Sequence, residues 1–326
     1  MTLRIAFIGC GYIASASHGP ACVHYAASHT GVELAACCDA DAARARALGQ
    51  GFGFARSYTD YAEMLRTEDP SAVFLCVPEG VAADIGADLL GKGVPVLLEK
   101  PPAMTVADMD RLIAIAAAKG TIHQVAFNRR FAPLVVRLRG LLQGQAVQHV
   151  DHSFTRVGRT RGDLATTAIH ALDTLRFLLR SDYRSARLSY HEHSDLGEGV
   201  ADYVVDCTFT NGATGHLTIS PVAGANVERV AVYSAGNTYQ VSLNWGDDAP
   251  GRLQHWHQGR LVLDLDAAQA SGSAEDYVVS GFYAQDEAFF DAVQAGRQPT
   301  DDLASARQSV EMMQCLRERR KEYIRG

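Results

Sequence analysis

Apolar and polar residues alternate in two different ways along the chain. In the first half, short apolar runs with almost no polar interruption occur at residues 3–8, 32–38, 72–77, 94–98 and 122–127. Such runs are typical of strands covered on both faces, and the segments between them have helical periodicity. One segment begins at Thr105, has an acid three residues later and stops at Gly120, as a capped helix does. This alternation predicts an α/β fold with a parallel, doubly wound sheet.

The second half of the chain has a different pattern. Strand-like segments lie at residues 147–156, 200–210, 214–220, 227–234, 238–243 and 261–265, and helical periodicity at 164–179, 283–295 and 303–322. Asn211-Gly212, between two expected strands, is a strong hairpin signal. At roughly 150 residues per domain, the 326 residues suggest two domains. We expect a first domain over residues 1–124 and a second over 125–326, with the last helix packing back on the first.

Composition and charge narrow the range of functions. With 47% hydrophobic and 21% charged residues the sequence is globular, and its formal net charge of -7 argues against nucleic acid or an anionic membrane as partner. No apolar stretch approaches the roughly 20 residues of a membrane span, and the first residues lack a signal-peptide pattern, so we expect a cytoplasmic protein. The seven cysteines form no C-x-x-C pair and are expected to be reduced and buried.

The first apolar run is followed directly by G-C-G-Y-I-A, a G-x-G-x-x-A fingerprint. Gly9 would allow the tight turn, and Gly11 would let a pyrophosphate approach the backbone. Backbone N–H groups at the next helix start, including those of Tyr12 and Ile13, would hold the phosphates. An ordinary turn is the alternative. Pro20 predicts that the following helix is kinked or begins afresh there.

The second apolar run ends in an acid, Asp39. In a dinucleotide-binding βαβ unit an acid at this position binds the adenosine ribose diol, and it would repel the additional phosphate of NADP. The pattern therefore favours NAD. In the alternative, Asp39 or Asp41 only caps the helix that follows. Arg44 could reach a 2′-phosphate if Asp39 turned away.

The run at residues 94–98 ends in Glu99, Lys100 and two prolines. A buried parallel strand delivers such a lysine to the carboxyl edge of the sheet, where ligands gather in α/β folds. The prolines forbid helical continuation and keep the segment extended. Lys100 is therefore a candidate proton carrier. The alternative is a solvated ion pair of Glu99 and Lys100 at the strand end.

The expected helix at residues 164–179 has a polar face. Thr166, His170 and Asp173 recur at intervals of four and three, and His170 is a second candidate base because histidine titrates at about pH 6.5. Histidine pairs at 191/193 and 255/257 share strand faces but have no further ligand nearby, so we expect no metal site. Arginines at 156, 159 and 161 form either a lip that contacts substrate or cofactor, or a solvated face.

Features in four places resemble the glucose-fructose oxidoreductase / inositol dehydrogenase family, Gfo/Idh/MocA. They are the fingerprint, the run ending in Pro78, Glu99-Lys100-Pro101 and the segment F-N-R-R-F-A-P at residues 127–133. The resemblance implies an N-terminal Rossmann domain and a C-terminal α+β domain with a large, open, mostly antiparallel sheet. It implies NAD(P)-dependent hydride transfer at a secondary alcohol or carbonyl of a sugar, polyol or related hydroxylated small molecule. It also implies a homodimer or homotetramer formed through the C-terminal sheet.

The same resemblance implies roles for individual residues. Lys100 and His170 are expected to be catalytic, and the expected substrate contacts are Asn128, Arg130, Thr166 and Asp173. The expected cofactor contacts are Gly9, Gly11, Tyr12, Ile13, Asp39, Val77, Pro78, Glu99 and Lys100. The chain departs from the family pattern at Thr166, where an acid is usual, at Ala168, where glycine is common, and at Ala82, where histidine is usual.

A mechanism follows from these roles. Oxidation of an alcohol needs a base within hydrogen-bond reach of the hydroxyl. We expect His170 to take the proton while Lys100 polarises the oxygen, with the roles reversed in reduction, and Asp173 to orient the substrate or the histidine. One alternative is an NAD-dependent sugar lyase or glycosidase that oxidises its substrate transiently. Another is a non-catalytic nucleotide-sensing regulator, which the missing acid at position 166 would favour.

Overall fold

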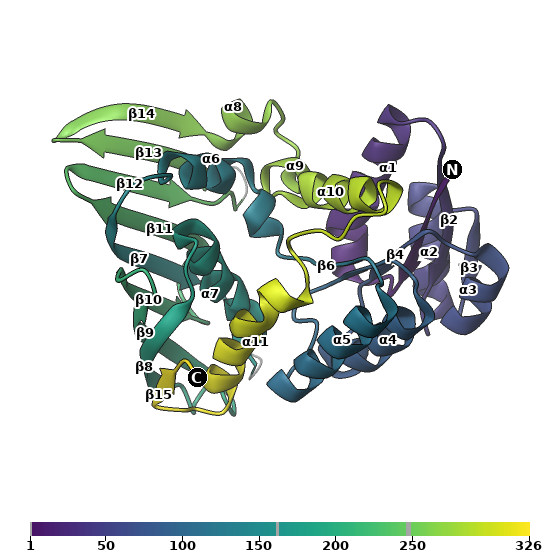
Figure 1. Cartoon of the computed structure of the whole chain (residues 1–326), viewed down its shortest axis with the longest axis horizontal. Helices are drawn as coiled ribbons and strands as arrows, with labels where there is room; N and C mark the ends of the chain where they lie inside the picture. Colours follow the sequence, from purple (N-terminus) through teal and green to yellow (C-terminus); the bar gives the residue numbers. More distant parts are fainter. Residues whose placement is uncertain (1, 161–162, 246–248) are drawn as a thin grey trace. The chain divides into compact units, whose positions relative to one another are not determined.

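The computed structural model describes residues 2–160, 163–245 and 249–326. These residues form two compact units, each built on its own sheet (Figure 1). The first unit runs to Asn128 and also contains Gly281–Val310, and the second consists of Arg129–Ser280 and Glu311–Gly326. The first unit therefore differs from the expected 1–124, because a helix that follows residue 280 contributes apolar side chains to its core.

Parallel strands build the sheet of the first unit, in the order β3-β2-β1-β4-β5-β6. This is the Rossmann strand order, so the predicted doubly wound sheet is confirmed. The strands are β1 (Leu3–Ile8), β2 (Val32–Cys38), β3 (Arg56–Tyr58), β4 (Ala72–Leu75), β5 (Val96–Leu98) and β6 (His123–Val125). The helices are η1 (Ala14–His18), α1 (Gly19–Ser28), α2 (Ala42–Phe52), α3 (Tyr61–Glu68), α4 (Glu79–Lys92), α5 (Val106–Lys119) and α10 (Phe282–Gln294).

An aromatic cluster ties α10 to this sheet. Phe7 of β1 stacks on Phe74 of β4 with ring centroids 4.7 Å apart. Phe289 and Phe290 of α10 meet Phe74 edge-on at 6.0 and 5.6 Å. All four rings are fully buried. Burying two phenylalanines of α10 contributes several kcal/mol at about 25 cal/mol per Å² of apolar surface, which explains why this late segment joins the first unit.

The direction of the strand order reverses between β1 and β4. Ligands in open α/β sheets bind outside the carboxyl ends of strands at such a switch point. The loop after β1 carries the fingerprint, and the segments after β4 and β5 carry Val77, Pro78, Glu99 and Lys100. The predicted cofactor residues of the first unit therefore lie at one edge of the sheet, in the segments that follow its parallel strands.

The sheet of the second unit is mixed. In the described part of the chain its order is β14-β13-β12-β11-β7-β10-β9-β8-β15, with β7 and β10 parallel and all other neighbours antiparallel. The strands are β7 (Val147–Thr155), β8 (Tyr183–Glu192), β9 (Ala201–Phe209), β10 (Thr214–Ser220), β11 (Val227–Ser234), β12 (Asn237–Ser242), β13 (Arg252–His257), β14 (Arg260–Asp266) and β15 (Glu322–Ile324). The helices are η2 (Asn128–Phe131), α6 (Pro133–Leu141), α7 (Ala165–Leu179), α8 (Ala267–Ser271), α9 (Asp276–Val279) and α11 (Leu303–Arg317), which runs across the division of the units at Val310.

One face of this second sheet is covered by helices. Val150, His152 and Phe154 of β7 are buried at alternate positions, as expected for a strand with one covered face. α7 packs against β7, and α6 packs against β12 and β13. The expected α+β domain with a large, mostly antiparallel sheet is therefore confirmed.

Two details of the second unit correct the sequence prediction. The helix expected to run to residue 322 ends at Arg317, and Arg319 has a positive φ of 52° that turns the chain into β15. β15 pairs with β8. The pattern predicted a strand only at the end of β8, around His191, because the exposed residues of β8 are mostly polar and its apolar ones few. The hairpin at Asn211-Gly212 is confirmed: β9 and β10 are antiparallel, and Gly212 has a φ of 91°.

Candidate active site

The fingerprint loop has the shape that a dinucleotide requires. Gly9 has a φ of 91°, and a Cβ at this position would lie 2.2 Å from the carbonyl oxygen of Cys76, so only glycine fits. A Cβ at Gly11 would meet nothing within 4 Å, which means that the backbone here faces open space. The two glycines thus have different roles: Gly9 packs against the segment after β4, and Gly11 leaves room for another molecule to approach the backbone. The residues present fit a bound dinucleotide.

The two acids after β2 have separate functions. Asp41 caps α2, and its side chain accepts hydrogen bonds from the backbone N–H groups of Ala43 and Arg44. Asp39 instead accepts the Cys10 N–H at 2.8 Å through Oδ2, and the Asp41 N–H at 2.9 Å through Oδ1. The Asp39 carboxylate is therefore fixed beside the fingerprint loop, where a ribose ligand is expected, and the capping alternative applies to Asp41. Nε of Arg44 lies 3.7 Å from Asp41, so this arginine is paired with the cap.

The helix after the fingerprint begins in two stages. A π-helical turn, η1, covers Ala14–His18, and the α-helix proper begins at Gly19 with Pro20 in its first turn. The restart predicted from Pro20 is therefore confirmed. Tyr12, at the beginning of this segment, has an 84% exposed side chain. π-helical turns are rare and occur frequently at functional sites.

Lys100 directly follows a tightly held acid. The Lys100–Pro101 peptide bond is cis, and the Lys100 side chain is half-buried. Oε2 of Glu99 accepts the backbone N–H of Lys100 at 3.0 Å. Oε1 of the same carboxylate lies 3.1 Å from Nε2 of His18. Glu99 is therefore part of a hydrogen-bonded cluster, and the alternative of a purely solvated Glu99–Lys100 pair does not describe it.

His18 is a buried residue that the sequence pattern did not single out. Its Nδ1 lies 2.9 and 3.0 Å from the two carboxylate oxygens of Asp286 on α10. Burial alone would lower the pKa of His18, but Asp286 and Glu99 together outweigh it and raise this pKa to about 10. His18 is therefore an imidazolium at neutral pH, held between two carboxylates.

The raised pKa of His18 gives the folding free energy a pH dependence. A group whose pKa is higher in the folded state stabilises the fold fully below its unfolded pKa of about 6.5, and this stabilisation is lost as the pH rises toward about 10. We expect the free energy of unfolding, measured with urea, to fall between pH 6.5 and 9 more steeply in the wild type than in His18→Gln. Equal slopes for the two proteins would contradict a charged His18.

In the second unit, α7 carries the predicted residues Thr166, His170 and Asp173, all buried. Nη1 of Arg129, on η2, lies 3.3 Å from Nε2 of His170. A guanidinium only donates hydrogen bonds, so Nε2 accepts and the neutral ring carries its proton on Nδ1. Nε2 is therefore the basic nitrogen of the ring, and it can take a proton only when the hydrogen bond from Arg129 is released.

The structure joins two of the predicted substrate residues to each other. Arg130 donates from Nε and Nη2 to the two carboxylate oxygens of Asp173 at 2.8 and 2.7 Å, and both side chains are buried. The hydroxyl of Thr166 donates to the backbone carbonyl of Asp163 at 2.9 Å. Asn128 begins η2 and is 2% exposed. Lys100 belongs to the first unit and these residues of α7 to the second.

A second ionic cluster near His170 was not predicted. Glu228 of β11 accepts from Nε and Nη2 of Arg129 at 3.1 and 2.7 Å, and also from Arg156. Burial would raise the pKa of Glu228, but the two guanidinium groups outweigh it and lower this pKa to about 2. Burial lowers the pKa of the neighbouring His152 to about 4, so this ring is neutral. Arg161 of the predicted arginine cluster lies outside the described residues.

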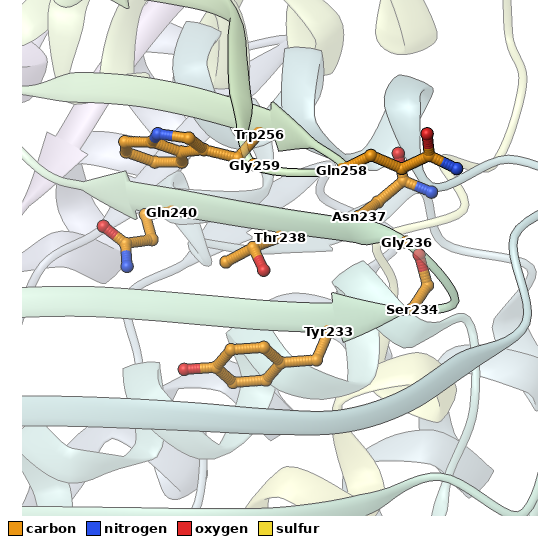
Figure 2. Close-up of a pocket in the computed structure, with 9 residues that line it drawn as sticks. All are labelled: Tyr233, Ser234, Gly236, Asn237, Thr238, Gln240, Trp256, Gln258 and Gly259. Carbon is orange, nitrogen blue, oxygen red and sulfur yellow. The ribbon is translucent and has the colours of Figure 1, made fainter.

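A shallow hollow lies on the sheet of the second unit, across β11, β12 and β13 (Figure 2). Its volume is about 570 Å³, and its lining includes Tyr233, Thr238, Gln240 and Trp256. None of the predicted site residues lines it, and its lining has no carboxylate, lysine or histidine. The hollow therefore lacks a base for alcohol oxidation and is separate from the candidate active site.

Comparison with known proteins identifies relatives of this chain. Residues 3–127 match the model of an oxidoreductase family with an NAD-binding Rossmann fold, GFO_IDH_MocA. Inositol 2-dehydrogenase of Salmonella typhimurium strain LT2 is 27% identical over 269 residues, which covers 72% of this chain and 79% of that protein. D-Apiose dehydrogenase of Paraburkholderia graminis is 29% identical over 248 residues, covering 68% of this chain and 65% of that protein.

Solved structures share the fold over the whole chain. An oxidoreductase domain protein from Kribbella flavida has a TM-score of 0.84 at 21% identity and covers 99% of both chains. GenD2 from gentamicin A biosynthesis, in complex with NAD, has a TM-score of 0.80 at 21% identity, covering 100% of this chain and 97% of that one. The 3-ketoreductase KijD10 from Actinomadura kijaniata, in complex with NADP and TDP-benzene, has a TM-score of 0.80 at 18% identity and covers 98% of both chains.

Fold, fingerprint geometry and family match together define an NAD-binding, Rossmann-fold oxidoreductase of the dehydrogenase class. The NAD-binding domain of the chain, residues 3–127, belongs to the Gfo/Idh/MocA family. Within the described residues, no helix has the length and apolar character needed to cross a bilayer.

Proposed function

We propose that the protein is an NAD-dependent dehydrogenase that acts on a secondary alcohol or carbonyl of a sugar, a polyol or a related hydroxylated small molecule. The observation that carries the proposal is the sheet edge of the first unit. Three features lie there, each after the end of a strand. The open backbone at Gly11 follows β1, the fixed carboxylate of Asp39 follows β2, and Lys100 follows β5. The names of the relatives, an inositol and an apiose dehydrogenase, support the substrate class.

The cofactor residues that we propose are Gly9, Gly11, Tyr12, Ile13, Asp39, Val77, Pro78, Glu99 and Lys100. When bound, the nicotinamide supplies or accepts the hydride. Lys100 polarises the substrate oxygen, and His170 takes the hydroxyl proton at Nε2 once the hydrogen bond from Arg129 to this nitrogen is released. Asn128, Arg130, Thr166 and Asp173 remain the proposed substrate contacts, with Arg130 and Asp173 acting as a pair since each holds the other.

We propose NAD as the physiological cofactor. The Asp39 carboxylate is held in place by the Cys10 and Asp41 N–H groups, so a 2′-phosphate brought to the ribose position would meet a fixed negative charge. We expect NADH to bind at least about tenfold more tightly than NADPH, a difference of about 1.4 kcal/mol. Asp39→Ser should lose most of this preference. Fluorescence titrations with both cofactors measure it, and an NADPH preference in the wild type would contradict the assignment.

We also propose a homodimer or homotetramer formed through the second sheet. The support is the face that carries the hollow of Figure 2, where two large aromatic side chains, Tyr233 and Trp256, are only half-buried in this chain. Half-exposed aromatic residues are enriched at protein interfaces. Light scattering of the wild type and of Trp256→Lys tests this proposal.

A panel of polyols, aldoses and glycosides with NAD⁺ tests the proposed activity. A net rise of nicotinamide absorbance with at least one alcohol is expected. Conversion of a sugar without net NADH would instead support the lyase or glycosidase that oxidises its substrate transiently. Tight cofactor binding with no conversion of any substrate would support the nucleotide-sensing regulator and contradict the proposal.

A further inference from the structure

We propose that His18 is a positioning residue for Lys100: it holds the Glu99 carboxylate, which in turn holds the backbone of Lys100. The inference rests on the proposed function, in which Lys100 acts on the substrate oxygen. His18 itself is a buried side chain within the first unit, and the proposal gives it no contact with substrate.

The geometry is a continuous chain of hydrogen bonds from α10 to Lys100. Asp286 contacts Nδ1 of His18 at 2.9 and 3.0 Å. Nε2 of the same ring lies 3.1 Å from Oε1 of Glu99, and Oε2 of Glu99 accepts the Lys100 N–H at 3.0 Å. Both ring nitrogens and both Glu99 oxygens are therefore used. The Glu99 carboxylate cannot turn toward another partner without breaking two of these bonds.

The surroundings of the ring make this arrangement rigid. His18 is 0% exposed and packs against Phe74 at 5.1 Å and edge-on against Phe282 at 5.2 Å. In such an apolar pocket a charged ring is stable only when both of its nitrogens are hydrogen-bonded to groups of opposite charge. Its own helical segment supports it, since the π-helical turn η1 ends at His18.

Two carboxylates and two thiols surround the ring or face its carboxylate partners. Glu99 approaches from the end of β5 and Asp286 from α10. The thiols of Cys22 on α1 and Cys76 after β4 also face these carboxylates, and burial raises the pKa of both, so both stay neutral. His18 is thus the cation of this cluster, and it balances the carboxylate nearest to Lys100 in the sequence.

Loss of the cation changes the partner of Glu99. The Glu99 carboxylate loses the imidazolium and can pair with the ammonium group of Lys100, the next residue. A carboxylate paired with an ammonium group favours the protonated lysine. The Lys100 ammonium group would then be held by Glu99 and be less available to the substrate oxygen.

The first test is the kinetics of His18→Gln. We expect kcat to fall 10- to 100-fold, an effect on the order of one positioned group. KM and the Kd for NADH should stay within about threefold of the wild type. The matched control is His123→Gln, a histidine of β6 that is also buried and whose ring bonds the nearby Thr121 carbonyl through Nδ1 at 2.8 Å. Its kcat should not change.

The second test observes Lys100 directly and needs no turnover. The chain has only four lysines, so NMR of protein labelled with ¹³C-lysine gives four side-chain signals, and Lys100→Arg identifies that of Lys100. The residues concerned are Lys92, Lys100, Lys119 and Lys321. We expect the titration midpoint of Lys100 to rise by about one pH unit in His18→Gln and to stay unchanged in His123→Gln.

The outcomes separate the two proposals. If the wild type turns over no substrate, the proposed function fails, and the NMR titration still decides the role of His18. An unchanged Lys100 midpoint, or a raised midpoint with an unchanged kcat, would overturn the positioning role. If His18→Gln does not fold, Asp286→Asn keeps the ring and removes one partner. It should change the Lys100 midpoint and kcat in the same directions by smaller amounts, and no change in either would overturn the proposal.

Discussion

Replacing Lys100 with methionine is expected to reduce turnover at least about a thousandfold while the Kd for NADH stays within about threefold. Methionine keeps much of the length and apolar volume of the lysine stem but cannot donate a hydrogen bond or carry a proton. General acid–base groups contribute about 10²- to 10⁴-fold to a rate, and loss of polarisation adds to this. The backbone N–H of residue 100, which Glu99 holds, is retained.

The measurement compares kcat and NADH affinity for Lys100→Met and for Lys119→Met. Lys119 ends α5, is exposed, and provides the same substitution away from the sheet edge. Lys119→Met should match the wild type in both quantities. A Lys100→Met protein with more than about a tenth of wild-type turnover would remove Lys100 from the reaction.

Replacing Glu228 with glutamine is expected to destabilise the second unit by about 3–5 kcal/mol, the usual cost of removing one member of a buried ionic cluster. Glu228 is 3% exposed and bonds both Arg129 and Arg156, so the variant removes the negative charge that these two guanidinium groups share. The lowered pKa of Glu228 determines how its contribution to the free energy of unfolding changes with pH. Its stabilisation is present above the unfolded pKa of about 4.5 and is lost as the pH falls through about 2.

Urea unfolding of Glu228→Gln and of Asp264→Asn measures this effect. Asp264 pairs with Arg252 on the surface of the same sheet, so its substitution removes an exposed ion pair and should leave the unfolding midpoint unchanged. Equal midpoints for the two variants would show that the buried cluster contributes no more than a surface pair. The Glu228 variant should also show a shallower decline in stability below pH 4.5 than the wild type.

The sequence predicted the first unit well, because its signals are local. Each signal needs no more than about ten consecutive residues. β1 shows the buried strand, the fingerprint shows the glycine turn, and α1 shows the proline near a helix start. The two acids Asp39 and Asp41 show the limit of such signals. Both can cap a helix by their spacing, and only the fold shows that Asp41 does so while Asp39 turns to the Cys10 N–H.

The ionic clusters could not be predicted, because their members are far apart in the chain. His18 and Asp286 are 268 residues apart, and Arg129 and Glu228 are 99 apart. A single His or Glu within a helix or strand gives no sign of its partner. Likewise, the helical face that places Thr166, His170 and Asp173 together was correct, but it did not show that Asp173 bonds Arg130.

The central claim is that the protein transfers a hydride between a hydroxylated substrate and NAD. The most direct measurement is mass spectrometry of the cofactor after incubation of the protein with NAD⁺ and polyols deuterated at their carbinol carbons. We expect deuterium in the NADH formed by the wild type, and none above background with Lys100→Met. A protein that binds NAD⁺ but returns an unlabelled cofactor with every polyol and sugar offered would contradict the claim.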